Sequence, residues 1–155
     1  MNKLKFGLVG AGGIAQAYAQ AFNESSCCEL IAVADVREDA AAALAEIVNG
    51  WSVTDYTQMS ELDLDAVIVA TPPTTHAEIA CFFMERGIPV LCEKPLTTNV
   101  ADAERMIATA EKAGVQFTMA SKFRYCEDVV KAKGILASGV LGQVLHFENA
   151  FTAKV

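Results

Sequence analysis

The chain has 155 residues, of which 53% are hydrophobic and 20% are charged, and this balance excludes a disordered polar chain. The length fits one domain of ordinary size with a substantial core. The formal net charge of −7 argues against nucleic-acid partners and anionic membrane surfaces, because both recruit proteins through basic surface.

Short apolar runs alternate along the chain with segments of helical periodicity. Strands are expected at residues 5–9, 29–34, 51–53, 65–70, 89–92 and 116–119, and a last strand at 143–151. Helices are expected at residues 14–22, 38–48, 75–86, 100–113 and 128–137. Asn49-Gly50, Gly87 and Gly114 mark three helix ends, since glycine readily takes the left-handed conformation there. No run of 18 apolar residues occurs, so no membrane-spanning helix is expected.

This alternation predicts an α/β fold with a doubly wound parallel sheet. Helices between successive strands give parallel pairing through right-handed crossovers. Two halves of three strands each predict the strand order 3-2-1-4-5-6. The ligand crevice of such a sheet lies at the carboxyl ends of the first and fourth strands.

The first expected strand runs into a glycine-rich turn that suits a pyrophosphate. Gly10 allows a sharp turn, because glycine takes positive φ at little cost. Gly12 leaves out a side chain where the backbone must approach a phosphate, and Ala15 is small enough for the helix to pack on the strand. The helix opens at Gly13 and Ile14, where free N–H groups and the helix dipole favour an anion. The pattern G-x-G-x-x-A between a strand and a helix therefore predicts dinucleotide binding.

Asp35 closes the second expected strand and bears on the choice of cofactor. A carboxylate here accepts hydrogen bonds from the adenosine ribose hydroxyls and repels a 2′-phosphate, which favours NAD. The alternative role for Asp35 is a helix N-cap. Arg37 leaves the choice open, because its guanidinium can stack on adenine, clamp the 2′-phosphate of NADP, or lie solvated. NAD is the expected cofactor and NADP is the alternative.

The fourth expected strand is followed by Thr71, Pro72 and Pro73. Prolines give a rigid apolar wall against which a ring can lie, although they also suit an ordinary helix start. His76, one turn into the helix, is expected to face the cofactor or to cap the helix. His146 is the only other histidine, and no cluster has the spacing of metal ligands, so no metal site is expected.

The fifth expected strand ends at Glu93, Lys94 and Pro95. A lysine beside the crevice is placed to donate a hydrogen bond or a proton to a substrate oxygen near the nicotinamide. The alternative is an exposed surface lysine without a role in catalysis.

The cysteines indicate the compartment. There are five of them without C-x-x-C spacing: Cys27, Cys28, Cys81, Cys92 and Cys126. An odd number of scattered thiols is typical of a reducing compartment. The basic and apolar N-terminus imitates a secretion signal, but glycines break the apolar run, so we expect a cytoplasmic protein.

Several of these motifs occur in one order along the chain. They are the glycine turn, Asp35-x-Arg37, Ala70-Thr71-Pro72-Pro73 with His76, Glu93-Lys94-Pro95, Phe123-Arg124-Tyr125 and the tail at 134–147. In this order they resemble the glucose–fructose oxidoreductase/inositol dehydrogenase (Gfo/Idh/MocA) family over essentially the whole chain. The resemblance implies an NAD(P)-dependent oxidoreductase acting on sugars, cyclitols or related alcohols. By this likeness Lys94 binds and polarises the reacting oxygen, while Glu93 and Arg124 lie near the nicotinamide and the substrate.

The same resemblance divides the chain. It implies a dinucleotide-binding domain at residues 1–121, and at 122–155 the connecting helix and first strand of a second, α+β domain. In the family that domain supplies an Asp and a His that complete proton transfer. We therefore expect the nucleotide-binding portion of a dehydrogenase, inactive by itself. It is expected either to self-associate through the strand at 143–151 or to leave that segment disordered.

Two classes of function remain in competition. The alternative to an enzyme portion is a non-catalytic dinucleotide-binding module or sensor fragment, because the Asp and His segment is missing. A methyltransferase is disfavoured because residues 71–73 and 93–95 have no role in one, and a flavoenzyme because the chain has no room for a domain that covers a flavin. The expected partner is a small-molecule substrate, with neither nucleic acid nor membrane.

Overall fold

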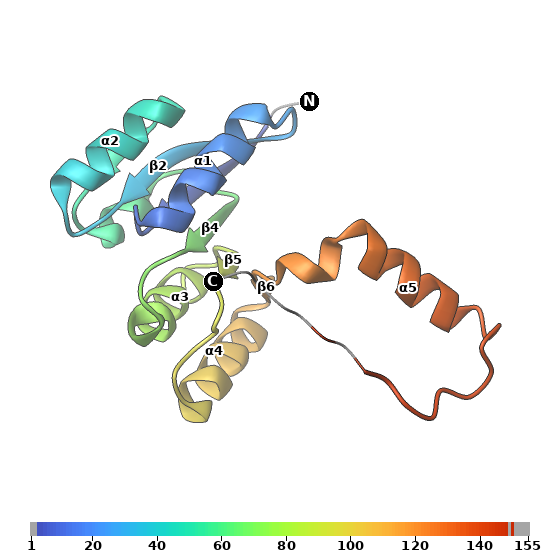
Figure 1. Cartoon of the computed structure of the whole chain (residues 1–155). Helices are drawn as coiled ribbons and strands as arrows, with labels where there is room; N and C mark the ends of the chain where they lie inside the picture. Colours follow the sequence, from blue (N-terminus) through green and yellow to red (C-terminus); the bar gives the residue numbers. More distant parts are fainter. Residues whose placement is uncertain (1–2, 149, 151–155) are drawn as a thin grey trace. The chain divides into compact units, whose positions relative to one another are not determined.

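The computed structural model describes residues 3–148 and 150. Helices and strands alternate along most of the chain (Figure 1). The strands are β1 Leu4–Val9, β2 Cys28–Ala34, β3 Trp51–Val53, β4 Ala66–Val69, β5 Val90–Cys92 and β6 Phe117–Met119. The α-helices are α1 Gly13–Glu24, α2 Glu38–Val48, α3 His76–Met84, α4 Val100–Ala113 and α5 Glu127–Ala137. Three short 3₁₀ helices lie at η1 Tyr56–Glu61, η2 Pro73–Thr75 and η3 Lys122–Tyr125.

The six strands form one sheet in the order β3-β2-β1-β4-β5-β6, and every neighbouring pair is parallel. The predicted fold class and strand order are therefore confirmed. The carboxyl ends of β1 and β4 are neighbours, since Val9 pairs with Val69. The order of the strands reverses between them, which makes this edge the ligand crevice of a doubly wound sheet.

The sheet carries a core on each face. On one face Leu8, Val33 and Ile68 pack with buried residues of α1 and α2. On the other face Val9 and Val69 pack with buried residues of α3 and α4. The helices therefore cover the sheet in the pairs α1 with α2 and α3 with α4 (Figure 1). Because both faces are covered, the strands read as continuous apolar runs rather than as alternating ones.

The predicted last strand is wrong over the residues that the structure describes. Residues 143–148 form neither a helix nor a strand, while 149 and 151 lie outside the described residues. Alternating apolar residues form a strand only where a neighbouring strand accepts their backbone hydrogen bonds. The described sheet consists of β1 to β6, and residues 143–148 pair with none of these strands.

The chain divides into two units, residues 1–120 and 121–155. The first unit holds the sheet and α1 to α4. The second holds η3 and α5, on which Val130 and Ile135 are exposed. Among the described residues no helix is both long and apolar enough to cross a membrane.

Candidate cofactor and active site

Gly10 makes the turn at the end of β1. Its φ is +104°, a conformation that favours glycine, and its N–H donates to the Ala34 carbonyl oxygen at 2.7 Å. A Cβ atom on this residue would lie 2.6 Å from the carbonyl oxygen of Ala70. The position therefore needs glycine for two reasons, its φ and the close approach of the chain after β4.

The start of α1 is open and uncapped. Gly12 is the N-cap and supplies no side chain, and the first turn holds no acidic residue. Apart from the adjacent residues and the helix backbone itself, no described heavy atom lies within 4 Å of where a Cβ of Gly12 or Gly13 would stand. Ile14 is half exposed at this end, whereas Ala15 is fully buried against the sheet. This end of the helix, with its free N–H groups, fits a phosphate group.

Asp35 joins three segments near the crevice. Its Oδ2 accepts the Ala11 N–H at 2.7 Å, and its Oδ1 accepts the Arg37 N–H at 2.9 Å. The Nε of Arg37 lies 3.3 Å from the same Oδ1, and the side chains of Asp35 and Arg37 are 11% and 62% exposed. Burial raises the pKa of Asp35, but the backbone N–H groups of Arg37 and Ala11 and then the guanidinium outweigh it and hold the pKa below 3.8. The N-cap of α2 is Arg37, so the alternative role of Asp35 as the cap is not borne out.

His76 is fully buried at the start of α3 and holds two segments together. Its Nε2 lies 2.8 Å from the carbonyl oxygen of Thr71, just after β4. Its Nδ1 lies 3.2 Å and 3.1 Å from the carbonyl oxygens of Pro95 and Leu96. The segment after β4 is therefore fixed to the segment that follows Lys94. Pro72 beside it is exposed.

Glu93 and Lys94 directly follow β5. The Glu93 N–H donates to the Val69 carbonyl oxygen at 2.8 Å, which brings this segment to the end of β4. The two oxygens of the Glu93 carboxylate accept the Tyr18 hydroxyl at 2.8 Å and the Lys94 N–H at 3.0 Å. The peptide bond between Lys94 and Pro95 is cis, and the side chain of Lys94 is exposed. The Lys94 side chain is therefore open to solvent directly after β5.

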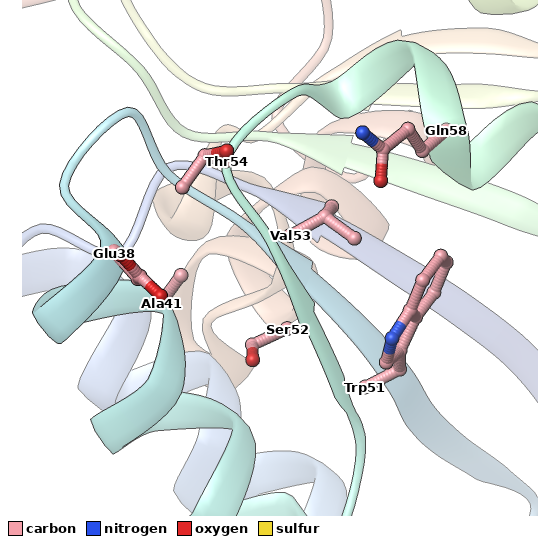
Figure 2. Close-up of a pocket in the computed structure, with 7 residues that line it drawn as sticks. All are labelled: Glu38, Ala41, Trp51, Ser52, Val53, Thr54 and Gln58. Carbon is pink, nitrogen blue, oxygen red and sulfur yellow. The ribbon is translucent and has the colours of Figure 1, made fainter.

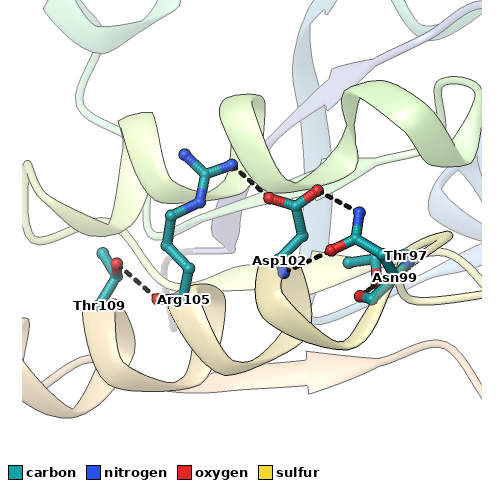
Figure 3. A network of polar contacts seen from close by, with 5 residues as sticks. All are labelled: Thr97, Asn99, Asp102, Arg105 and Thr109. Atoms are coloured by element: carbon teal, nitrogen blue, oxygen red, sulfur yellow. Dashed lines mark hydrogen bonds and ion pairs between the residues drawn. The ribbon is translucent and has the colours of Figure 1, made fainter.

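A network at the start of α4 anchors the far end of the same segment (Figure 3). Asn99 accepts the Asp102 N–H at 2.9 Å and donates from its side-chain amide to Asp102 Oδ2 at 2.7 Å. Arg105 pairs with Asp102 at 2.9 Å. The hydrogen bond from Asn99 is the largest cause that lowers the pKa of Asp102. Residues 93–99 are thus held at both ends, with the exposed Lys94 between the anchors.

The family model described as an oxidoreductase family with an NAD-binding Rossmann fold matches residues 4–121. The chain belongs to the Gfo/Idh/MocA family. The predicted family is confirmed, and with it the NAD-binding character of the fold.

Two curated members of the family illustrate the similarity. The chain is 31% identical to glucose-6-phosphate 3-dehydrogenase of Bacillus subtilis, over 95% of this chain and 42% of that enzyme. It is 35% identical to inositol 2-dehydrogenase 4 of Saccharopolyspora erythraea, over 93% of this chain and 44% of that enzyme. The chain thus spans less than half the length of these relatives.

Solved structures from the family resemble this chain closely. The WlbA dehydrogenase of Chromobacterium violaceum, crystallised with NADH and UDP-GlcNAcA, has a TM-score of 0.86 at 28% identity. A 3-ketoreductase of Actinomadura kijaniata, crystallised with NADP, has a TM-score of 0.81 at 32% identity. Each match covers 92% of this chain, and 42% and 46% of the respective structures. The family therefore includes proteins bound to either nicotinamide cofactor.

The predicted site residues of the first unit gather at the carboxyl edge of the sheet. Gly10, Asp35, Thr71 and Lys94 follow β1, β2, β4 and β5 at their carboxyl ends. The remaining predicted site residue, Arg124, belongs to η3 of the second unit. Tyr18 is a residue at this edge that the motifs do not indicate.

A hollow lies beside the residues that follow β2, since Val53 in its lining accepts the Asp35 N–H at 3.2 Å. The hollow has a volume of about 290 Å³ and runs along β3 between α2 and η1 (Figure 2). It is lined by Glu38, Ala41, Trp51, Ser52, Val53, Thr54 and Gln58, and none of the predicted site residues is among them. Within residues 3–148 and 150, no group of three His, Cys, Asp or Glu side chains could hold a metal ion.

Proposed function

We propose that this chain binds NAD(H) across the carboxyl ends of β1 and β4. We further propose that the complete protein moves a hydride between the nicotinamide and a sugar, cyclitol or related alcohol. The observation that carries the proposal is the joint geometry of Gly10, Asp35 and Lys94 at one sheet edge. We assign this activity to the cytoplasm and expect neither nucleic acid nor membrane as a partner.

The start of α1 would hold the pyrophosphate. The open N–H groups at Gly12, Gly13 and Ile14 offer donors in a region of favourable dipole. No side chain competes for them, since the N-cap is a glycine and the first turn lacks an acid. A bulky residue at Gly12 would stand where the phosphate is proposed to lie.

Asp35 would bind the adenosine ribose. Its Oδ2 accepts the Ala11 N–H and keeps a further lone pair for a ribose hydroxyl, whereas Oδ1 accepts from both the backbone N–H and the Nε of Arg37. The depressed pKa keeps the group charged at neutral pH, and the charge repels a 2′-phosphate. NADP remains the alternative because Arg37 is largely exposed and joined to Asp35 only through its Nε and its backbone.

Thr71 and Pro72 would form one wall of the nicotinamide site. Pro72 is exposed after β4. The Nε2 of His76 lies within hydrogen-bond distance of the Thr71 carbonyl oxygen and holds this segment in place. The ring of His76 is itself fully buried. We therefore assign His76 a supporting place at the cofactor site rather than contact with the ring.

Lys94 would act on the reacting oxygen. The bound nicotinamide supplies an acceptor or donor of hydride at the substrate carbon. The Lys94 ammonium donates a hydrogen bond to the substrate oxygen and stabilises the negative charge that develops on it. Arg124 and Glu93 are proposed near the substrate and nicotinamide by likeness to the family. The proton of the alcohol needs a further acceptor. We therefore expect the 155-residue chain alone to bind the cofactor without turning over a substrate.

The catalytic part of the proposal is tested with Lys94→Met in the complete protein. We expect kcat to fall at least 100-fold, about the lower range for a general acid or base, while the Kd for NADH stays unchanged. A variant that retains wild-type kcat on every sugar and cyclitol tried would contradict the role of Lys94. Robust NAD reduction by the 155-residue chain alone would contradict the expected need for the second domain.

A further inference from the structure

Tyr18 ties the helix after the glycine turn to the segment that carries Lys94. Its ring packs, partly buried, against the core cluster beneath α1. Its hydroxyl donates to Oε1 of Glu93 at 2.8 Å, a bond between residues 75 positions apart. The contacts proposed above for cofactor and substrate do not use this hydroxyl.

The Glu93 side chain is held on both of its oxygens. Oε1 accepts from Tyr18, and Oε2 accepts the backbone N–H of Lys94 at 3.0 Å. The backbone N–H of Glu93 is fixed in turn to the Val69 carbonyl at 2.8 Å. The carboxylate therefore bridges α1 and the main chain of Lys94.

The charge of Glu93 acts on its buried neighbours. Burial and then the hydrogen bond to Glu93 raise the pKa of Tyr18 above its ordinary value of 10.0. Burial and then the Glu93 charge raise the pKa of Cys92 to about 12. The Tyr18 hydroxyl therefore remains a protonated donor at neutral pH, and its bond to the carboxylate persists there.

We propose that Tyr18 is a positioning residue that acts through Glu93 to fix the main chain at Lys94. This inference rests on the function proposed above, because that function gives the hydrogen bond between Tyr18 and Glu93 a role. The helix whose first turn would receive the pyrophosphate is joined by one side chain to the lysine that would meet the reacting oxygen. The distance between these two contacts is thereby set within the protein before either ligand binds.

The hydrogen bond from Tyr18 matters because the Glu93 side chain that it orders would otherwise be flexible. A glutamate side chain loses considerable rotamer freedom when it is fixed, and without Tyr18 one of its two anchors is gone. The Lys94 N–H then loses a steadily placed acceptor. Misplacement of a reacting group by about 1 Å can cost on the order of 100-fold in rate. A partial loss of order at Lys94 is accordingly expected to lower kcat about tenfold.

The test is Tyr18→Phe, which removes the hydroxyl and keeps the ring that packs under α1. In the 155-residue chain we expect the Lys94 amide proton to exchange with solvent at least threefold faster, measured by NMR. The Kd for NADH should change less than threefold, since Tyr18 is not a binding residue. In the complete protein we expect kcat to fall about tenfold with little change in KM.

Two further variants test whether the effect is specific to the hydrogen bond between Tyr18 and Glu93. Tyr56→Phe is the matched control, because Tyr56 donates to Glu78 at 3.5 Å on the α3 side of the molecule, and it should leave Lys94 exchange and kcat unchanged. Glu93→Gln leaves one acceptor oxygen for the two donors, the Tyr18 hydroxyl and the Lys94 N–H, so Lys94 exchange should rise with Tyr18 intact. The proposal is overturned if Tyr18→Phe leaves Lys94 exchange and kcat at wild-type values. A wild-type chain that fails to bind NADH would count against the proposed function, while the exchange comparison in the free chain would still decide the role of Tyr18.

Discussion

Asp35 shows how much one side chain can organise at this sheet edge. Its two oxygens hold the N–H of Ala11 in the glycine turn and the N–H of Arg37 at the start of α2. Both segments are therefore shaped by the same carboxylate that we propose for the ribose. Loss of its charge should alter cofactor choice and acid stability in separable ways.

Cofactor preference should follow the charge at this position. Asp35→Ser removes a ribose acceptor and the charge that repels a 2′-phosphate, while Arg37 remains. We expect the ratio of NADP affinity to NAD affinity to rise at least tenfold, or about 1.4 kcal/mol. Calorimetric titration of both cofactors measures the ratio, and an unchanged ratio would remove Asp35 from the account of cofactor choice.

The acid stability of the chain should depend on Asp35. Its pKa in the folded chain is depressed, so its contribution to stability is present above the ordinary pKa of 3.8 and is lost as pH falls through the folded value. Asp35→Asn should therefore be less stable than the wild type at pH 7, by about 1.5–3 kcal/mol, the range for a hydrogen bond to a charged group. Urea unfolding at pH 7 and pH 3 should show this difference shrinking at the lower pH. An equal difference in unfolding free energy at pH 7 and pH 3 would refute the stabilising role of the Asp35 charge.

At the residue scale the sequence predicts best where the cause is local. The φ of Gly10 and the place of Asp35 follow from a short motif around each residue. Tyr18 is predictable only as part of the buried face of a helix, because its partner Glu93 is 75 positions away. The contacts of His76 likewise depend on how two loops meet in the folded sheet.

At the element scale the start of α4 sets the end of the segment that carries Lys94. Asn99→Ala removes the side-chain oxygen that accepts the Asp102 N–H. We expect a loss of about 1 kcal/mol in the free energy of unfolding, typical for an N-cap. Asn99→Ser, which keeps a capping oxygen, should recover most of it. Urea denaturation measures both, and equal stability of the alanine variant and the wild type would show that the cap contributes nothing.

The helices and strands of the sheet were predictable because their signals lie within each segment. The helix ends at Asn49 and Gly114 adopt the left-handed conformation that their residue types favour. Bounds shift by at most two residues, as for α3, which spans His76–Met84 instead of 75–86. The strand at 143–151 fails over its described part because pairing with another strand is not a local property. An alternating pattern alone does not say whether a partner is within reach.

At the scale of the whole molecule the tail of the second unit exposes apolar side chains. Leu145 is 86% exposed and Phe147 is 75% exposed. We propose that the chain self-associates through this segment, because large apolar side chains exposed close together favour association. Light scattering coupled to size exclusion should show a mass that rises with protein concentration, and the double variant Leu145→Asp, Phe147→Asp should remain a monomer. A wild-type chain that stays monomeric at high concentration would contradict this.

Taken as a whole, the molecule is proposed to bind a nicotinamide dinucleotide at the carboxyl ends of β1 and β4. The most direct measurement is calorimetric titration of the 155-residue chain with NADH and with NADPH, beside the variant Gly12→Val. We expect NADH to bind with one site per chain and more tightly than NADPH. The valine variant should fold and lose binding, because its side chain fills the space in front of α1. A folded wild-type chain that binds neither cofactor, or a Gly12→Val variant that binds NADH as tightly as the wild type, would contradict the account.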